Sequence, residues 1–365
     1  MKKSKVRKIG ILTAGGDCPG LNCVIRVIVK AAINEYGIEV IGFKDGYDGL
    51  VKNDFINLRS RDVSGIINLG GTILGTSNVA NPYRYPTTQG KKLILQDRSK
   101  DAIANYREND LDCLIAIGGD GTLTIASKLI KEGLNIVGCP KTIDNDLSGT
   151  DLTFGFESAV ATATEAIDKL HSTAQSHHRV MIVEVMGRYA GWIALYSGIA
   201  GGGDVILIPE IPYDMKKISK KLEERHKVGK RFSIIVIAEG AKPKGGKITV
   251  SKIVEASTDQ VRLGGVGTAL ANAVEEMTGL ETRATILGHL QRGGEPTPFD
   301  RILATRYGYE ALRLASAGKF GRMAAFQCGR VTSVPISKAI GKLKTVPKDY
   351  PLIEMAKAVG TSFGD

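Results

Sequence analysis

Short apolar runs that end in glycine- or proline-rich turns and lead into helical segments recur along this chain of 365 residues. The run "LDCLIAIGG" leads to "TLTIASKLIKEG", which leads to "NIVGCP". Strands that alternate with helices in this way predict βαβ units and a parallel sheet. We therefore expect an α/β fold.

A second set of strands predicts a second domain. A long helical pattern over residues 156–174 closes the first set, and "RVMIVEV", "DVILIP", "FSIIVIAEG" and "TRATILG" follow it. The chain is too long for one ordinary domain and long enough for two. No proline- or serine-rich linker separates the halves, so the sequence leaves their boundary soft.

Composition excludes several classes of protein. Hydrophobic residues make up 43% and charged residues 24%, which is typical of soluble globular chains. No run approaches the roughly 20 apolar residues of a membrane span, and the first apolar run is too short for a secretory signal peptide. The five cysteines lack metal-ligand spacing, so we expect reduced thiols in the cytoplasm.

The net charge of +11 attracts anions without saying which. Phosphorylated metabolites, nucleic acid and a merely solvated basic surface remain open at this point. Aromatic residues are only 6% of the chain and form no stacking platform, so nucleic acid is the weaker alternative.

Three turns stand at predicted strand ends: "TAGGDCPGLN" (13–22), "GGDGT" (118–122) and "PKTIDND" (140–146). Ligands collect at the carboxyl ends of parallel strands, and glycine lets backbone N–H groups approach a phosphate. The carboxylate of Asp120 fits such a turn if Mg²⁺ lies between it and the phosphate. One glycine turn alone is commonly only a tight turn, but three at equivalent positions favour a phosphate site. Their spacing matches neither the dinucleotide fingerprint nor Walker A.

The turn at 140–146 also offers a base. Asp144 and Asp146 share a face of an extended segment, so one could accept a hydroxyl proton while the other holds the water shell of a metal. Capping of an Asx turn is the structural alternative. In the second half, arginines match phosphate oxygens bidentately, and Glu239 could accept hydrogen bonds from sugar hydroxyls.

The ordered set of motifs resembles the 6-phosphofructokinase family from end to end. The matching segments are "GILTAGGDCPGLN", "GGTILGTS", "IGGDGT", "PKTIDND", "SHHRVMIVEVMGRYAGW", "ETRATILGHLQRGG" and "DRILATR". The resemblance implies a cytoplasmic, glycolytic kinase that uses Mg²⁺ to transfer a phosphoryl group from ATP to the 1-hydroxyl of fructose 6-phosphate, giving fructose 1,6-bisphosphate and ADP. It implies no nucleic-acid or membrane partner.

The resemblance also implies two Rossmann-like three-layer αβα domains. Residues 1–155 with about 291–341 would form the donor domain, and residues 156–290 with about 342–365 the sugar-phosphate domain.

The family's functional residues map onto this chain. The resemblance assigns the donor site to Gly15, Gly119, Asp120, Gly121 and Thr122, with Asp120 as the Mg²⁺ ligand and Asp144 as the proton acceptor. The substrate residues it implies are Thr142, Ile143, Asp144, Arg179, Met186, Gly187, Arg188, Glu239, Arg283, His289 and Arg292. Two of them, Arg179 and Arg283, match arginines that a neighbouring subunit supplies, in a homotetramer or homodimer with shared active sites.

Gly121 and Lys141 bear on donor specificity. Pyrophosphate enzymes of the family typically have aspartate at the position of Gly121, where a carboxylate would fill and repel the α-phosphate. Gly121 therefore favours ATP, whereas lysine before "TIDND" is typical of pyrophosphate enzymes, and a mixed clade has both features. We favour ATP on the steric argument and keep a pyrophosphate-dependent phosphotransferase as the alternative.

Two departures from the family pattern leave points open. Asn78 stands where the family has an arginine that reaches the donor phosphates, and Arg84 could replace it. At the usual effector site, where the family has arginines on the first helix, this chain has only Arg26 and Lys30, so allosteric control is left open.

A non-catalytic subunit that only binds a phosphorylated metabolite is a further alternative. Such a protein could lose Asp120 or Asp144, and the presence of both favours an enzyme.

Overall fold

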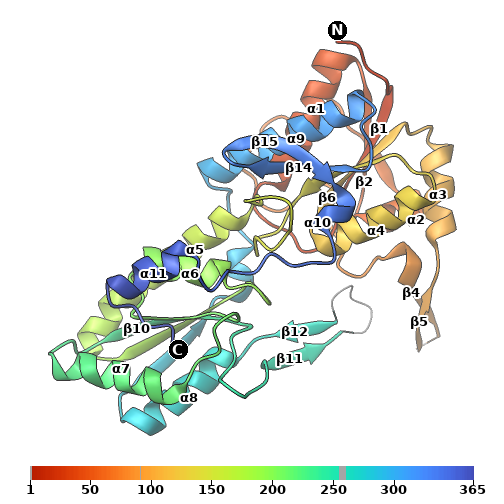
Figure 1. Ribbon diagram of the computed structural model, residues 1–365. Coiled ribbons are helices and arrows are strands. Elements are labelled where there is room, and N and C mark those ends of the chain that lie inside the picture. The colour runs from red at the N-terminus through yellow and green to blue at the C-terminus, as the bar shows by residue number, and fades with distance from the viewer. Residues whose placement is uncertain (1, 91, 255–259) are drawn as a thin grey trace.

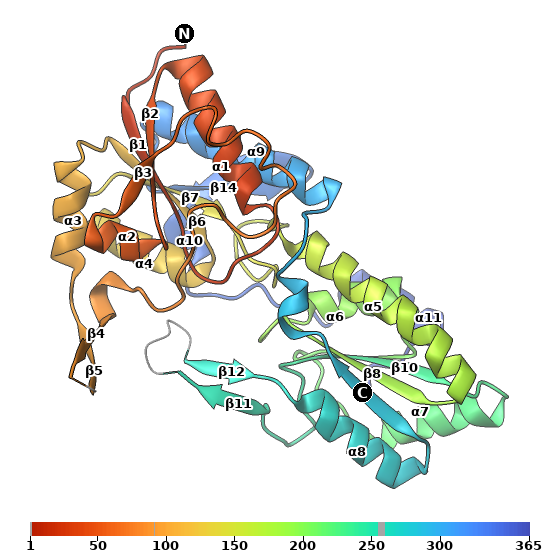
Figure 2. The same ribbon diagram turned by 180° about the vertical axis from the view of Figure 1, so that it is seen from behind.

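Two mainly parallel sheets, each packed between helices, dominate the computed structural model, which describes residues 2–90, 92–254 and 260–365 (Figure 1). This is the α/β fold that the alternating pattern predicts. The two sheets lie at opposite ends of an elongated molecule (Figure 2). Within the described ranges, no helix combines the length and apolar character that crossing a membrane requires.

The first sheet has seven described strands in the order β15-β14-β7-β6-β1-β2-β3. Its centre is parallel, with Ile11 of β1 opposite Ile115 of β6, and both edge strands are antiparallel. The strands are β1 (Lys8–Thr13), β2 (Glu39–Phe43), β3 (Phe55–Asn57), β6 (Cys113–Gly118), β7 (Ile136–Pro140), β14 (Arg322–Gln327) and β15 (Arg330–Pro335).

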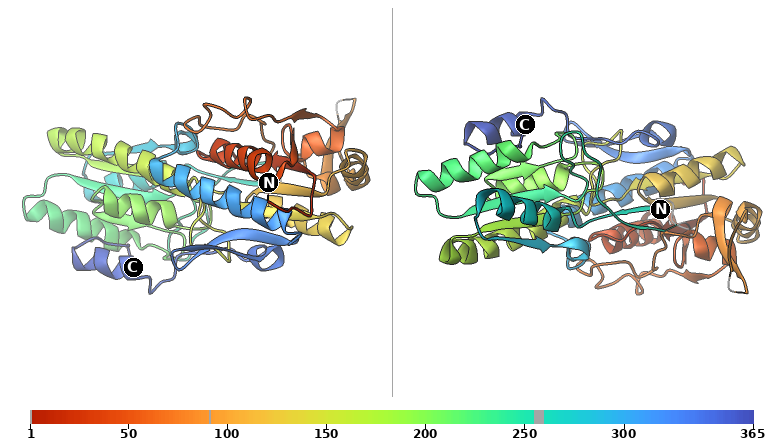
Figure 3. Two further views of the ribbon diagram at one scale, coloured as in Figure 1. Left: turned by 90° about the horizontal axis from the view of Figure 1, so that it is seen from above. Right: turned by 90° about the horizontal axis from the view of Figure 1, so that it is seen from below.

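Helices cover both faces of this sheet because the side chains of each central strand alternate between the faces. Ile115 packs under α1 (Leu21–Ala31) and α9 (Pro298–Ser316), which lie side by side (red and blue, left panel of Figure 3). Leu114 packs against the opposite layer. That layer consists of α2 (Tyr47–Lys52), α3 (Ser99–Glu108), α4 (Asp120–Lys131) and the short α10 (Ile336–Ala339).

The second sheet has four described strands in the order β13-β8-β10-β9, all parallel. They are β8 (Val180–Val185), β9 (Val205–Leu207), β10 (Ser233–Ala238) and β13 (Thr282–Ile286). Its helices are α5 (Phe156–His177) and α6 (Trp192–Ala200) on one face, α7 (Met215–Lys227) and α8 (Val266–Thr278) on the other, and α11 (Pro351–Ala358) beside α6. One apolar cluster continues from this sheet into the first, which fixes the two relative to each other.

Two hairpins lie outside the sheets and were not predicted. They are β4 (Tyr85–Gln89) with β5 (Lys92–Gln96), and β11 (Val250–Ile253) with β12 (Val261–Leu263). Their strands are short and largely exposed, so they lack the continuous apolar runs that reveal the buried strands. The second hairpin extends from the second sheet toward the first (Figures 1 and 2).

Candidate active site

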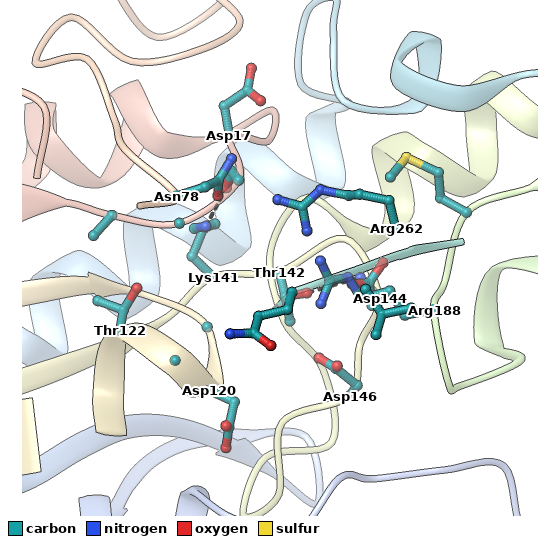
Figure 4. A pocket seen from close by; sticks show the side chains of 18 of the residues that line it. Asp17, Asn78, Asp120, Thr122, Lys141, Thr142, Asp144, Asp146, Arg188 and Arg262 are labelled. Carbon is teal, nitrogen blue, oxygen red and sulfur yellow. Dashed lines mark hydrogen bonds between the residues drawn. The ribbon is translucent and has the colours of Figure 1, made fainter. Parts of the chain in front are cut away.

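A cleft of about 1080 Å³ opens where the carboxyl ends of the strands of both sheets face each other. The turns after β1, β6 and β7 line it from the first sheet, and the turns after β8 and β10 line it from the second. Figure 4 shows that Asp120, Asp144 and Asp146 lie around this opening together with Arg188 and Arg262. The position agrees with the general preference of parallel sheets for ligands at strand ends.

The glycine turn after β1 brings backbone against two polar side chains. Gly15 has φ +81°, which disfavours an L side chain, and a Cβ there would lie 3.4 Å from Lys141 Nζ and 3.5 Å from Thr122 Oγ1. Neighbouring loops fix the turn, because Gly15 N–H donates to the Ser77 carbonyl at 3.1 Å and Thr76 Oγ1 donates to the Gly15 carbonyl at 2.6 Å. All three predicted turns therefore meet at Gly15.

Lys141 is a buried cation on the floor of the cleft. Lys141 is only 3% exposed, and its ammonium donates a hydrogen bond to the Gly16 carbonyl. Burial lowers the pKa of Lys141 to about 8, because desolvation disfavours the charged form. An anionic ligand in this corner would stabilise the charged form, which makes Lys141 a candidate phosphate contact.

The turn after β6 directs the start of α4 into the cleft. Asp120 is the first residue of that helix, where the N–H groups of the first turn have no intrahelical acceptors. The Asp120 carboxylate accepts a hydrogen bond from Gly341 N–H at 2.8 Å, and Tyr47 OH donates to the Thr122 carbonyl at 2.8 Å. This turn thus presents amide donors and one carboxylate to the same space.

The turn after β7 holds the two predicted carboxylates. Asp144 is 6% exposed, and its buried Oδ1 has no hydrogen-bond partner among the described residues. Burial, followed by the charge of Asp144, raises the pKa of Asp146 to about 7. A buried carboxylate oxygen without a partner is costly unless a ligand uses it, so Asp144 is the strongest candidate for a group that acts on a substrate.

The second sheet contributes arginines and a glutamate. Gly187 has φ +133°, and a Cβ there would lie 2.6 Å from the Ala190 carbonyl oxygen, so the turn after β8 requires glycine. The turn places Arg188 so that its N–H donates to Glu239 Oε1 at 3.1 Å. Burial, with Asp144 as the next contribution, raises the pKa of Glu239 to about 7.

Three guanidinium groups, those of Arg188, Arg262 and Arg292, reach this side of the cleft. Arg292 Nη1 donates to the Asp17 carbonyl at 3.1 Å, which joins the turn before α9 to the turn after β1. Burial, and then the charges of Arg188 and Arg292, lower the pKa of Arg262. Like charges gathered at a partly desolvated place favour an anionic ligand there.

Most of the predicted site residues line this one cleft. They are Gly15, Gly119, Asp120, Gly121, Thr122, Lys141, Thr142, Asp144, Met186, Arg188, Glu239, His289 and Arg292. Ile143 is 0% exposed and belongs to the apolar core, and Gly187 shapes its turn without lining the cleft. Asn78 and Arg84, whose roles the sequence left open, both line it.

Arg179 and Arg283 lie at the end of the second sheet that faces away from the cleft. Arg179 precedes β8 and Arg283 is the second residue of β13, so both are at the amino ends of parallel strands. Their guanidinium groups contact Glu281 Oε1 at 2.7 and 2.6 Å, respectively. Neither residue lines the cleft of its own chain.

Sequence reasoning missed several cleft residues, namely Asp17, Tyr189, Ser251, Lys252, Gln260, Arg262, Gly341 and Leu343. Asp17 and Tyr189 lie within motifs that were identified and could have been included. The hairpin residues and Gly341 with Leu343 follow no apolar strand, so no local pattern marks them.

Comparison with known proteins shows which proteins this chain resembles. The sequence profile described as Phosphofructokinase matches residues 8–315. The chain is 52% identical to "ATP-dependent 6-phosphofructokinase 2" of Clostridium perfringens, covering 99% of each, and 51% identical to "ATP-dependent 6-phosphofructokinase" of Spirochaeta thermophila, covering all of both.

A solved structure of Pichia pastoris phosphofructokinase in the T-state superposes with a TM-score of 0.78 at 31% identity, over 99% of this chain. This chain spans only 37% of the yeast chain. A pyrophosphate-dependent phosphofructokinase from Marinobacter aquaeolei has a TM-score of 0.77 over 94% of this chain and 86% of its own, and at 24% identity it supports the fold alone. By profile, by full-length identity and by fold, the chain belongs to the phosphofructokinase family.

Proposed function

We propose that the chain transfers the γ-phosphoryl group of ATP to the 1-hydroxyl of fructose 6-phosphate, a step of glycolysis. Its relatives in Clostridium perfringens and Spirochaeta thermophila are named ATP-dependent 6-phosphofructokinases and match it over their full length. The observation that carries the proposal is the buried Asp144 Oδ1, which has no hydrogen-bond partner among the residues that the structure describes and belongs to the same cleft as the glycine turns and the arginines.

The donor binds against the first sheet in this proposal. Gly15, which has no side chain, lets the donor approach its turn closely, the turn 119–122 offers backbone N–H groups, and Lys141 offers a cation between them. Residues 1–155 with about 291–341 then form the donor domain, and residues 156–290 with about 342–365 the sugar-phosphate domain. The membership of the seven-stranded sheet, which takes β14 and β15 from late in the chain, supports this division.

Mg²⁺ fits the donor side through Asp120. The described residues contain no group of three or more histidine, cysteine or carboxylate ligands, which suits a cation that takes most of its ligands from phosphates and water. When bound, Mg²⁺ would neutralise charge on the transferring phosphates. Asp120 at the start of α4 is the carboxylate placed to hold it.

Asp144 acts as the base. The oxygen of the 1-hydroxyl forms a bond to the γ-phosphorus, the bond from that phosphorus to the β–γ bridging oxygen breaks, and the hydroxyl proton passes to Asp144. Such a loose transition state needs positioning and charge neutralisation more than covalent help. Within this proposal, the amides of turn 119–122 and Lys141 stabilise the donor phosphates.

The sugar phosphate binds against the second sheet. Arg188 and Arg292 hold the 6-phosphate, and Glu239 accepts from a sugar hydroxyl. The remaining contacts come from Thr142, Met186 and His289, while Ile143 and Gly187 shape the turns that carry Thr142 and Arg188. Convergence of most of these groups on one cleft supports the assignment.

Arg179 and Arg283 complete the site of a neighbouring copy of the chain. Their position away from their own cleft supports this assignment. Exposed apolar side chains occur in the adjoining segment at Ile286, Leu290, Phe299 and Ile302, which suits burial in a homodimer or homotetramer.

The five cysteines are all free thiols, which suits a protein of the reducing cytoplasm.

A panel of donors tests the reaction. The purified chain is incubated with fructose 6-phosphate and Mg²⁺ and with ATP or pyrophosphate in turn, and fructose 1,6-bisphosphate is measured. We expect turnover with ATP and at least tenfold less with pyrophosphate. Turnover with pyrophosphate alone would overturn the interpretation of Gly121, and no turnover with either donor would overturn the proposed reaction.

A further inference from the structure

Residues 341–346, here named the C-terminal strap, run along the carboxylate turns of the cleft. Gly341 N–H donates to Asp120 Oδ1 at 2.8 Å. Leu343 pairs with Leu147 in an antiparallel bridge, and Lys344 N–H donates to the Asp146 carbonyl at 2.8 Å. The strap thus contacts the turn after β6 and the turn after β7 at once.

The ammonium of Lys344 is bound within the second of these turns. It donates to Asn145 Oδ1 at 2.9 Å, to the Thr150 carbonyl at 3.0 Å and to the Asp151 carbonyl at 2.7 Å. These contacts use all three donors of an ammonium group. Burial lowers the pKa of Lys344 to about 8.

Asn145 lies between the two carboxylates and has a strained backbone, with φ +51°. Its Oδ1 accepts from Thr153 N–H at 3.1 Å as well as from Lys344. These two bonds restrain Asn145 and therefore the backbone of the turn that carries Asp144.

The strap is also anchored to the second sheet. Trp192 Nε1, at the start of α6, donates to the Lys344 carbonyl at 2.8 Å, and Lys344 Nζ lies 5.5 Å from the centre of the Trp192 ring system. Glu210 Oε1 accepts from Val346 N–H at 2.8 Å and from Gly191 N–H at 3.0 Å. The strap therefore holds the carboxylate turns against a fixed point on the other side of the cleft.

We propose that Lys344 is a positioning residue for the phosphoryl transfer: through Asn145 it holds Asp144 in the direction that the reaction requires. The inference rests on the proposed function of Asp144. A positioning role differs from a stabilising one in its effect: removal of the Lys344 side chain must slow the catalytic step, and it must do so through Asn145.

Lys344→Met tests the proposal, with Lys357→Met as the matched control. Lys357 is also a lysine over an aromatic ring, 5.7 Å from Phe363, but it pairs with Asp365 outside the cleft. A small misplacement of reacting groups costs on the order of 10²-fold in rate. We expect kcat to fall about 10- to 100-fold in Lys344→Met, with the KM values for both substrates changed less than about threefold, and no such fall in Lys357→Met.

A double-mutant cycle separates positioning from simple loss of stability. If Lys344 acts through Asn145, then Lys344→Met adds little to the fall in kcat that Asn145→Ala already causes. All variants are assayed well below their unfolding midpoints. Effects on kcat that multiply, or a kcat of Lys344→Met within twofold of the unmodified chain, would overturn the proposal. If Lys344→Met does not fold, the same cycle is run with Lys344→Arg, whose planar fork cannot reproduce the three contacts.

Tryptophan fluorescence gives a readout that does not depend on activity. Trp192 is the single tryptophan of the chain, and its indole contacts the strap at two points. We expect Lys344→Met to change its emission while Lys357→Met leaves it unaltered. An unchanged spectrum in Lys344→Met would contradict the contact between the Lys344 ammonium and the indole. If Lys344→Met alters the spectrum but the unmodified chain has no kinase activity, the proposed function is wrong and the contact between Lys344 and Trp192 still holds.

Discussion

At the scale of single residues, Lys141 shows how burial prepares a group for its ligand. Its side chain is buried against the glycine turn after β1, where its ammonium donates to the Gly16 carbonyl. The pKa of Lys141 therefore falls to about 8, and the folded chain bears the cost of burying the charge below that pH. A donor phosphate would offset this cost, because it supplies the opposite charge.

This gives a pH dependence of stability with a definite sign. The folded pKa of Lys141 is about 8, against an ordinary value of 10.5, so the unfolded chain binds more protons between these values. The free energy of unfolding of the unmodified chain should therefore rise relative to that of Lys141→Met as pH increases from about 8 to about 10.5, by roughly 3 kcal/mol. Urea unfolding of both chains across this range measures it. A difference that stays constant with pH would show that Lys141 is not desolvated as described.

At the scale of elements, the strand–turn–helix units were predictable and the hairpins were not. The strands β1, β2 and β6 follow the apolar runs that mark them, because a buried parallel strand needs apolar residues on both faces. The residues of strand β11 are exposed and those of β12 are only partly buried, so neither strand has such a signature. Yet β12 brings Arg262 beside Arg188 and Arg292, so an unpredicted element supplies part of the anion site.

Arg262 is expected to bind the sugar phosphate together with those two arginines. Arg262→Gln should raise the KM for fructose 6-phosphate about tenfold, the size expected for one charged hydrogen bond to an anion, and leave the KM for ATP unchanged. Lys247→Gln is the control, because this exposed lysine precedes the same hairpin and does not line the cleft. Initial-rate kinetics against each substrate decide it. If both substitutions raise this KM equally, Arg262 acts only through the net charge of the chain and does not contact the sugar phosphate.

At the scale of the whole molecule, the chain crosses between the sheets more than once and closes the cleft from both sides. The helix α9 and strands β14 and β15 return to the first sheet after the second is complete, and the strap then leads back to the second. Arg179 and Arg283 remain on the far edge, paired with Glu281. A site that uses them requires a second copy of the chain.

Mixing two impaired variants tests the shared site. Asp144→Asn and Arg283→Ala are refolded together and assayed at a fructose 6-phosphate concentration at which neither alone turns over appreciably. Random pairing leaves about a quarter of the sites unmodified, because one of the two sites in each mixed dimer has neither change. We expect that fraction of activity to return.

A matched mixture provides the control for this recovery. Asp144→Asn mixed with Asp120→Asn should recover nothing, since both residues serve the same subunit's cleft. Equal recovery in both mixtures, or none in either, would contradict the shared site.

The sequence by itself determined the α/β class, the glycine turns and the carboxylates of the site, because each depends on a few adjacent residues. An apolar strand, a turn that needs glycine at Gly15 and a helix that starts at Asp120 are local matters of backbone conformation. Only the tertiary structure decided that Arg262 lines the cleft and that Lys344 binds Asn145, next to Asp144. Their neighbours come from distant segments whose meeting depends on how the chain crosses between two sheets, and no local pattern encodes that path.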